Sequence, residues 1–169
     1  MLRHRLAALF EPRSLLVVAD RPLPVARNAP SALENALTLV DAGTSVAIPE
    51  RLNGVEAGGR VDLAVLCLPP SLLPQALEAL HRHRPRALLV LAAGTQPDRP
   101  ADDMALCQAW GSQNGCLVLG PRAFGLQNPA TGLNLSHAPE LAQTGRVALV
   151  SQSGSIASAV LDWAADIGL

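Results

Sequence analysis

Residues 61–91 read VDLAVLCLPPSLLPQALEALHRHRPRALLVL, and this stretch decides the fold. It opens with the apolar run Val61 to Leu68 and closes with the apolar run Ala87 to Leu91. Neither run alternates regularly between apolar and polar residues, which is typical of strands buried on both faces. Between them, apolar residues recur at helical spacing from Leu72 to Leu80. The stretch therefore predicts a strand, a helix and a second, parallel strand.

The residues before this stretch predict two more strands. Ser14 to Ala19 is an apolar run entered after a proline and left at an aspartate, and Ser45 to Ile48 is a shorter one. Only residues 51–60 separate the second of these from the strand at Val61, although a parallel crossover usually needs a dozen residues or more. We therefore expect a shrunken or missing helix there.

A capping box predicts a helix between these two strands. Ser31 and Glu34 stand three residues apart, so that the hydroxyl and the carboxylate can each accept a backbone amide of the first turn. Leu37 and Val40 continue the apolar face, and Gly43 can end the helix in the left-handed conformation.

After residue 91 the alternation of helix and strand continues. Met104 to Gln113 predicts a helix and Cys116 to Leu119 a fifth strand. His81 and His83 fall in the last turn of the preceding helix, where we expect solvated side chains beside the negative end of the helix dipole. The predicted fold class is α/β, a Rossmann-like doubly wound parallel sheet.

The C-terminal third departs from this pattern. No regular period is present from residue 122 to residue 144, but Arg146 to Val150 predicts one more strand and Ser155 to Ile167 an apolar helix. One strand and one helix cannot form a core of their own. We expect this unit to pack on the preceding domain or on a second copy, which would make a homodimer.

Composition excludes several classes of protein. The 169 residues include 13 Lys and Arg against 14 acidic residues, so the net charge of -1 gives no field that would attract nucleic acid or an anionic membrane. The longest apolar run is far too short to cross a membrane, and the first residues lack the apolar core of a signal peptide. Cys67, Cys107 and Cys116 lack the spacing of a metal site or redox pair. We expect a cytoplasmic protein with reduced cysteines and no metal.

Several short motifs resemble one known family. They are LGPRAFGL at 119–126, TGLN at 131–134 and VSQSG at 150–154, together with LFEPRS at 9–14 and VDLAV at 61–65. In these motifs the sequence resembles the NDP-forming acyl-CoA synthetases, the α-subunit of succinyl-CoA synthetase, and the synthetase-like region of bacterial protein lysine acetyltransferases that also carry a GNAT domain.

The resemblance implies a CoA-binding domain over residues 1–136 and the incomplete start of a second, flavodoxin-like domain over residues 145–169. The implied ligand is coenzyme A or an acyl-CoA, and the implied partner is the rest of a parent protein or a second subunit. None of the four histidines stands in the family's phosphohistidine setting. We therefore assign no catalytic residue, and we expect no synthetase or acetyl-transfer chemistry from this chain alone.

Ligands of doubly wound sheets bind outside the carboxyl ends of the strands. In the family that the sequence resembles, the turn before the last helix faces the transferred phosphate. As an N-terminal cap, the same turn would also have a purely structural role. The candidate residues of this turn are Ser151, Ser153 and Gly154. The candidate CoA-binding residues at the strand ends are Asp20, Arg21, Arg27, Pro49, Arg51, Leu68, Pro69, Pro70, Ala93, Gly94, Gly120, Pro121 and Arg122.

Two departures from the family leave other functions open. The loop after the first strand contains two prolines and Asp20 where relatives have glycine and small residues, and Arg122 stands where they usually have asparagine. One alternative is a degenerate regulatory or assembly module that has lost CoA. The other is an NAD-binding domain, for which Glu50 could hold a ribose but the glycine motif GxGxxG is missing.

Overall fold

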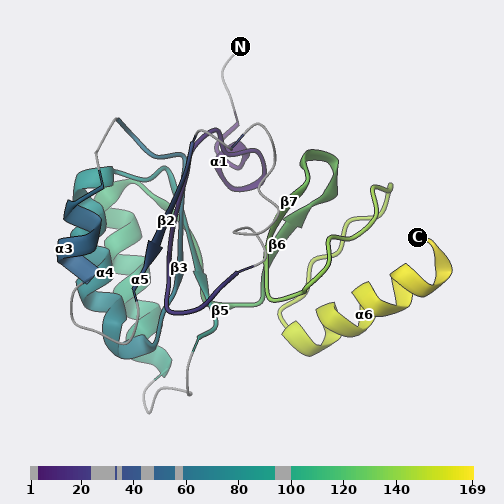
Figure 1. Cartoon of the computed structure of the whole chain (residues 1–169). Coiled ribbons are helices and arrows are strands. Elements are labelled where there is room, and N and C mark those ends of the chain that lie inside the picture. The colour runs from purple at the N-terminus through teal and green to yellow at the C-terminus, as the bar shows by residue number, and fades with distance from the viewer. Residues whose placement is uncertain (1–3, 24–32, 34–35, 43–47, 56–58, 94–99) are drawn as a thin grey trace.

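Five parallel strands form the central sheet of the computed structural model (Figure 1). The structure describes all residues except 1–3, 24–32, 34–35, 43–47, 56–58 and 94–99. The strand order is β2-β1-β3-β4-β5. The chain therefore reverses its direction of winding between β1 and β3, as in doubly wound folds. The strands are β1 (Leu15–Ala19), β2 (Leu37–Asp41), β3 (Leu63–Cys67), β4 (Ala87–Leu91) and β5 (Leu117–Ala123).

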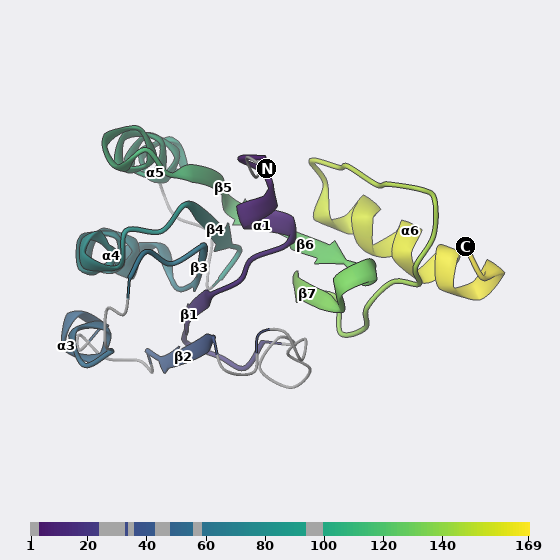
Figure 2. The ribbon, with the colours of Figure 1, turned by 90° about the horizontal axis from the view of Figure 1, so that it is seen from above.

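Three helices cover one face of the sheet (Figure 2). They are α3 (Ile48–Asn53), α4 (Leu73–Leu80) and α5 (Pro100–Asn114). Short 3-10 turns, Pro70–Leu72 and His81–His83, flank α4. On the other face lie α1 (Ala7–Phe10) and a two-stranded antiparallel sheet of β6 (Gly125–Asn128) and β7 (Leu133–Ser136), joined by the 3-10 turn Pro129–Thr131.

The sheet separates two hydrophobic cores, and each strand contributes to both. In β1, Leu16 and Val18 pack into the core under the helices, while Leu15 and Val17 pack into the core on the opposite face. β1, β3 and β4 are buried along their whole length, which explains their nearly continuous apolar sequence. The α/β fold with a parallel sheet is therefore confirmed.

A polar network lies inside the small sheet of β6 and β7. Gln127 Nε2 donates to Ser136 Oγ at 3.2 Å and to the Glu140 carbonyl at 2.8 Å, and its Oε1 accepts from the Ala142 amide at 2.9 Å. Asn134 Nδ2 donates to the Ala138 carbonyl at 3.0 Å. These bonds fasten residues 138–142 to the small sheet, so that the path of the chain leaving it is fixed.

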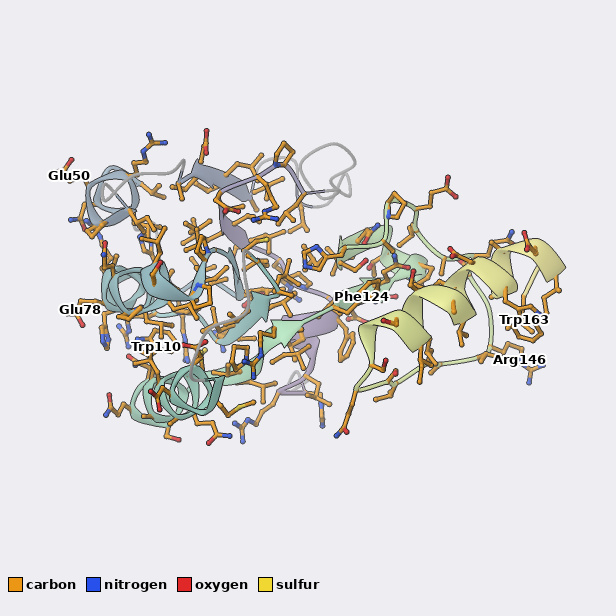
Figure 3. All side chains as sticks on the ribbon, turned by 90° about the horizontal axis from the view of Figure 1, so that it is seen from below. Glu50, Glu78, Trp110, Phe124, Arg146 and Trp163 are labelled. Carbon is orange, nitrogen blue, oxygen red and sulfur yellow. The ribbon has the colours of Figure 1, made fainter. Side chains whose placement is uncertain are left out.

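The helix α6 (Gly154–Ile167) extends away from the sheet, and the chain ends beyond it (Figures 1 and 3). Ser153 caps it, its Oγ accepting from the Ile156 amide at 3.3 Å. No residue of α6 is buried. Trp163 is 56% exposed and Val150, in the preceding segment, 96%. In this single chain, α6 is therefore not buried against the first domain, and its first residue, Gly154, contacts Phe124.

Two predicted elements differ in the structure. Leu37 and Val40, expected in a helix, belong to β2, which pairs in parallel with β1. Thr38, Leu39 and Val40 suit a strand, and the pairing outweighs their helical spacing. Ser31 and Glu34, and residues 45–47 of the expected second strand, lie outside the described residues. Ile48, its last residue, opens α3, the short helix that replaces a full crossover.

Other differences concern the C-terminal part. Residues 122–144, expected to be irregular, contain β6 and β7. β5 continues past Leu119 to Ala123. Residues 146–150 are not a strand in the structure, and they pair with no described strand. Among the described residues, no helix is long and apolar enough to cross a membrane.

His83 is not the solvated side chain that was expected. It is 1% exposed, and its Nε2 lies 3.2 Å from the Leu52 carbonyl oxygen. Burial lowers the pKa of His83 below its ordinary value of 6.5, an effect larger than the opposing hydrogen bond to Leu52. His81 is exposed as expected, and its Nδ1 lies 2.9 Å from Asn114 Oδ1.

Candidate functional site at the carboxyl edge of the sheet

The carboxyl ends of the parallel strands meet at one edge of the sheet. Ala19 of β1 pairs with Cys67 of β3, and Leu91 of β4 pairs with Ala123 of β5. The amide of Asp20, just past β1, donates to the Cys67 carbonyl at 3.1 Å, which ties β1 to β3 at the point where the winding reverses. Ligands of doubly wound sheets bind at such a point.

Asp20 and Arg21 form a closed ion pair at this edge. Arg21 Nε lies 2.7 Å from Asp20 Oδ1, and its Nη2 lies 3.1 Å from Oδ2. The hydrogen bond to Asp20 is the main cause that raises the pKa of Arg21. The Arg21 guanidinium, which could bind a phosphate, thus already donates two hydrogen bonds to Asp20.

A shallow pocket of about 300 Å³ lies between the ends of β1 and β2. Arg51, on α3, donates from Nη1 to the Asp41 carbonyl oxygen, which brings a second guanidinium to this end of the sheet. The pocket is lined by Val17, Ala19, Asp20, Arg21, Pro22, Leu23, Leu39, Val40 and Asp41.

Asp41 is a residue of this pocket that the sequence analysis missed. It ends β2 opposite Ala19 of β1, which is where a Rossmann-like domain carries its ribose-binding acid. Glu50, considered for that role, lies on α3 and is exposed (Figure 3). The β-branched residues Thr38 and Val40 could have indicated a strand that ends at Asp41.

The predicted residues at the ends of β3 and β4 reach the same edge. Leu68 directly follows β3 and is buried, and Ala93 follows β4 and is half-buried. Pro69 and Pro70 lead into the 3-10 turn before α4. Arg27 and Gly94 lie outside the described residues. Pro49 does not join the edge, since it lines a larger hollow of about 450 Å³ between α3 and α4. That hollow lies on the helical face, away from the strand ends.

The end of β5 has an unusual backbone. Gly120 has φ 111°, and a Cβ there would lie 2.4 Å from the Val90 carbonyl oxygen, so only glycine fits. The Gly120–Pro121 peptide bond is cis, and Pro121 is buried. Arg122 has φ 60°, the left-handed region that non-glycine residues rarely adopt. Its Nη1 is buried and has no hydrogen-bond partner in the described structure.

The turn before α6 lies apart from β1 and β2. Ser151 Oγ accepts from the Ser153 amide and donates to the Ser153 carbonyl, both at 3.0 Å. A Cβ on Gly154 would lie 3.2 Å from a ring carbon of Phe124, so the turn packs against the segment that follows β5 (Figure 3). The turn therefore contacts Phe124, two residues after Arg122 in the sequence.

The three cysteines are buried and free. Burial raises the pKa of Cys67 and Cys107 to about 11 and that of Cys116 to about 12. Such thiols are protonated and unreactive at neutral pH. No group of three metal-ligating side chains occurs in the described part of the chain.

The structure is a doubly wound α/β sheet with a charged pocket beside its switch point, between the ends of β1 and β2, and this edge is where such sheets bind ligands. Comparison with known proteins makes this class more specific, although no family model matches the chain. The chain is 29% identical over 111 residues to acetate–CoA ligase (ADP-forming) I of Archaeoglobus fulgidus, covering 61% of this chain and 15% of that protein. Over an alignment of 176 positions, it is 24% identical to the α subunit of acetate–CoA ligase (ADP-forming) I of Pyrococcus furiosus, covering 94% of this chain and 37% of that protein.

Solved structures share the fold. PH0766 of Pyrococcus horikoshii matches with a TM-score of 0.77 and 18% identity, over 97% of this chain and 40% of its own. The dinucleotide-forming acetyl-coenzyme A synthetase 1 of Ca. Korarchaeum cryptofilum matches with a TM-score of 0.70 and 21% identity, over 94% of this chain and 36% of its own. These homologues confirm, at modest identity, the resemblance to NDP-forming acyl-CoA synthetases. The chain spans well under half the length of each of these relatives.

Proposed function

We propose that this chain is the CoA-binding region of an NDP-forming acyl-CoA synthetase-like protein. The observation that carries the proposal is the alignment of 94% of the chain with the α subunit of an ADP-forming acetate–CoA ligase. The switch point between β1 and β3 supplies a suitable place for the nucleotide half of CoA. The named relatives are ligases, so a ligase parent is the form of the proposal that they support, rather than an acetyltransferase.

The charges at the edge fit a phosphate-bearing ligand. Arg21 lines the pocket between β1 and β2, and Arg51 hydrogen-bonds the carbonyl of Asp41, another lining residue. A guanidinium binds phosphate through paired N–H donors. To use Arg21 fully, CoA must compete with Asp20 for it. We therefore expect this chain to bind CoA with lower affinity than a relative that has glycines in the loop after β1.

The chemistry of the parent protein requires more than this chain. Two curated relatives are named as α subunits, which supports a second subunit or a further part of the parent as partner. We expect the purified chain to form no acyl-CoA from acid, CoA and nucleotide. Formation of a thioester above the rate of a blank would contradict this expectation.

Isothermal titration of the purified chain with CoA, acetyl-CoA and NAD tests the proposal. We expect CoA and acetyl-CoA to bind and NAD not to bind. Arg51→Gln should weaken CoA, whereas Arg13→Gln, which makes the same charge change at the amino end of β1, should not. Binding of NAD alone would favour a dinucleotide-binding domain.

The second candidate function is a degenerate regulatory or assembly module. The closed pair of Asp20 and Arg21, followed by Pro22 with no amide to donate, favours it. Absence of heat with all three ligands, from a chain shown by circular dichroism to be folded, would support this module and reject the CoA-binding proposal.

A further inference from the structure

Arg122 holds a buried cationic donor that the fold does not use. Its Nη1 is buried without an acceptor among the described residues, and no described acidic side chain forms a salt bridge with it. By contrast, among the described residues Arg21 forms a salt bridge with Asp20, and Arg86 with Asp62. A buried N–H of a charged group without an acceptor is costly, so an oxyanion supplied from outside would be stabilising there.

The backbone holds Arg122 in place. The backbone of Gly120 lies so close to the Val90 carbonyl oxygen that a side chain would not fit there. Further along β5, the pairing with β4 shifts register, and Ala123 pairs with Leu91. Arg122 takes the left-handed conformation between these two contacts. Strained backbone of this kind is found mostly at binding and catalytic sites. With Nη1 buried as well, the Arg122 side chain has less conformational freedom to lose when it binds an anion than an exposed arginine has.

Its place along the edge indicates which part of a ligand it could meet. Ala123, next to Arg122, pairs with the last residue of β4, so Arg122 lies at the carboxyl end of the sheet. β5 is three strands from β1 in the order β1-β3-β4-β5. At about 4.8 Å per strand, roughly 14 Å separates the end of β5 from the pocket beside β1.

That separation places Arg122 at a different part of the edge from a nucleotide bound at the pocket beside β1. CoA carries its phosphates on its nucleotide half, whereas the pantetheine arm that leads to the thiol is long and uncharged. With the nucleotide at the pocket beside β1, the arm would run along the edge towards β5. The group that meets Arg122 would then be at the thioester end, where CoA itself has no charge.

We propose that Arg122 binds an oxyanion at the acyl end of bound CoA. This inference rests on the proposed CoA-binding function. The oxyanion is either a carboxylate carried by the acyl group or a free phosphate that binds beside the thiol. Both offer the paired oxygen acceptors that a guanidinium binds.

Titration calorimetry with two matched acyl-CoAs shows whether the oxyanion comes from the acyl group or from free phosphate. Succinyl-CoA and butyryl-CoA both have four-carbon acyl groups, but only the first ends in a carboxylate. If the acyl group supplies the oxyanion, the unmodified chain should bind succinyl-CoA about tenfold tighter than butyryl-CoA. If phosphate supplies it, adding inorganic phosphate should tighten CoA by a similar factor.

Arg122→Gln should remove whichever preference is found, so that succinyl-CoA and butyryl-CoA bind alike and phosphate no longer tightens CoA. Arg13→Gln is the control and should keep the preference. Because Arg122 Nη1 has no hydrogen-bond partner among the described residues, we expect the melting temperature of Arg122→Gln without ligand to be no lower than that of the unmodified chain. If that variant does not fold, the unmodified chain still decides between the outcomes.

Equal affinity for the two acyl-CoAs, together with no effect of phosphate, would overturn the role of Arg122 while leaving CoA binding intact. A preference that survives in Arg122→Gln would also overturn it. Failure of every CoA compound to bind would reject the proposed function itself, and this inference with it.

Discussion

At the scale of the residue, the pair of Asp20 and Arg21 controls how much positive charge the pocket offers. Both Arg21 hydrogen bonds to Asp20 lie at the end of β1, where a phosphate would have to enter. The pair is exposed on the Arg21 side and contributes little to stability, since such pairs are worth about 0–1 kcal/mol. Its effect should therefore fall on ligand affinity.

Asp20→Asn should tighten CoA binding several-fold, because it removes a repelling charge and releases Arg21. Arg21→Ala should weaken it by about tenfold, as expected for the loss of one charge-assisted contact. Calorimetric titration measures both. Looser binding in Asp20→Asn would mean that Asp20 itself contacts the ligand.

Also at this scale, His83 should make stability depend on pH. Burial lowers its pKa below 6.5 in the folded chain, so the unfolded chain takes up the proton first as pH falls. The free energy of unfolding should therefore decrease as pH drops below about 6.5, the ordinary pKa of histidine.

Urea denaturation at pH 7.5 and 5.5 measures this loss. His83→Gln should reduce it, whereas His81→Gln, at an exposed position, should leave it unchanged. An equal loss of stability in the unmodified chain and His83→Gln would show that other groups cause it.

At the scale of the element, the small sheet of β6 and β7 depends on its polar network. Asn134 and Ser136 are buried, and Gln127 joins them to residues 138–142. Buried polar groups are stable only when each has a partner. The network therefore specifies how the chain passes from the sheet towards α6.

Asn134→Ala should lower the free energy of unfolding by about 1–3 kcal/mol, because Gln127, Ser136 and the Ala138 carbonyl each lose a partner. Gln113→Ala, at an exposed position on α5, is the control and should change it little. A loss below about 0.5 kcal/mol in Asn134→Ala, the range of surface substitutions, would mean that water replaces the lost bonds.

At the scale of the whole molecule, residues 145–169 stand apart from the sheet. None of the residues of α6 is buried, and Val147, Val150, Ile156 and Trp163 are all more than half exposed. Such a face adds little to the stability of the single chain and offers apolar surface for association.

Deleting residues 145–169 should therefore change the free energy of unfolding by less than about 0.5 kcal/mol. It should also reduce any concentration-dependent association seen by light scattering. Replacing Ile156 and Trp163 by serine in the full chain is the matched test and should reduce association equally. A large loss of stability on deletion would show that α6 packs on the sheet domain.

The sequence by itself determined the elements whose pattern is local. β1, β3, β4, α4 and α6 were predicted close to their observed bounds, because a buried strand or an amphipathic helix shows its burial in consecutive residues. Their alternation was enough to predict a parallel α/β sheet, and short motifs, most of them from the end of β5 onwards, carried the resemblance that the homologues confirm.

Only the tertiary structure decided the features that depend on distant partners. β2 is a strand because β1 offers it an edge, the network around Gln127 forms only once β6 and β7 pair, and His83 is buried by contact with Leu52. The same holds at the candidate site, where Arg51 reaches the Asp41 carbonyl and where Arg122 Nη1 becomes buried. Spacing along the chain does not encode such contacts, since packing between remote segments creates them.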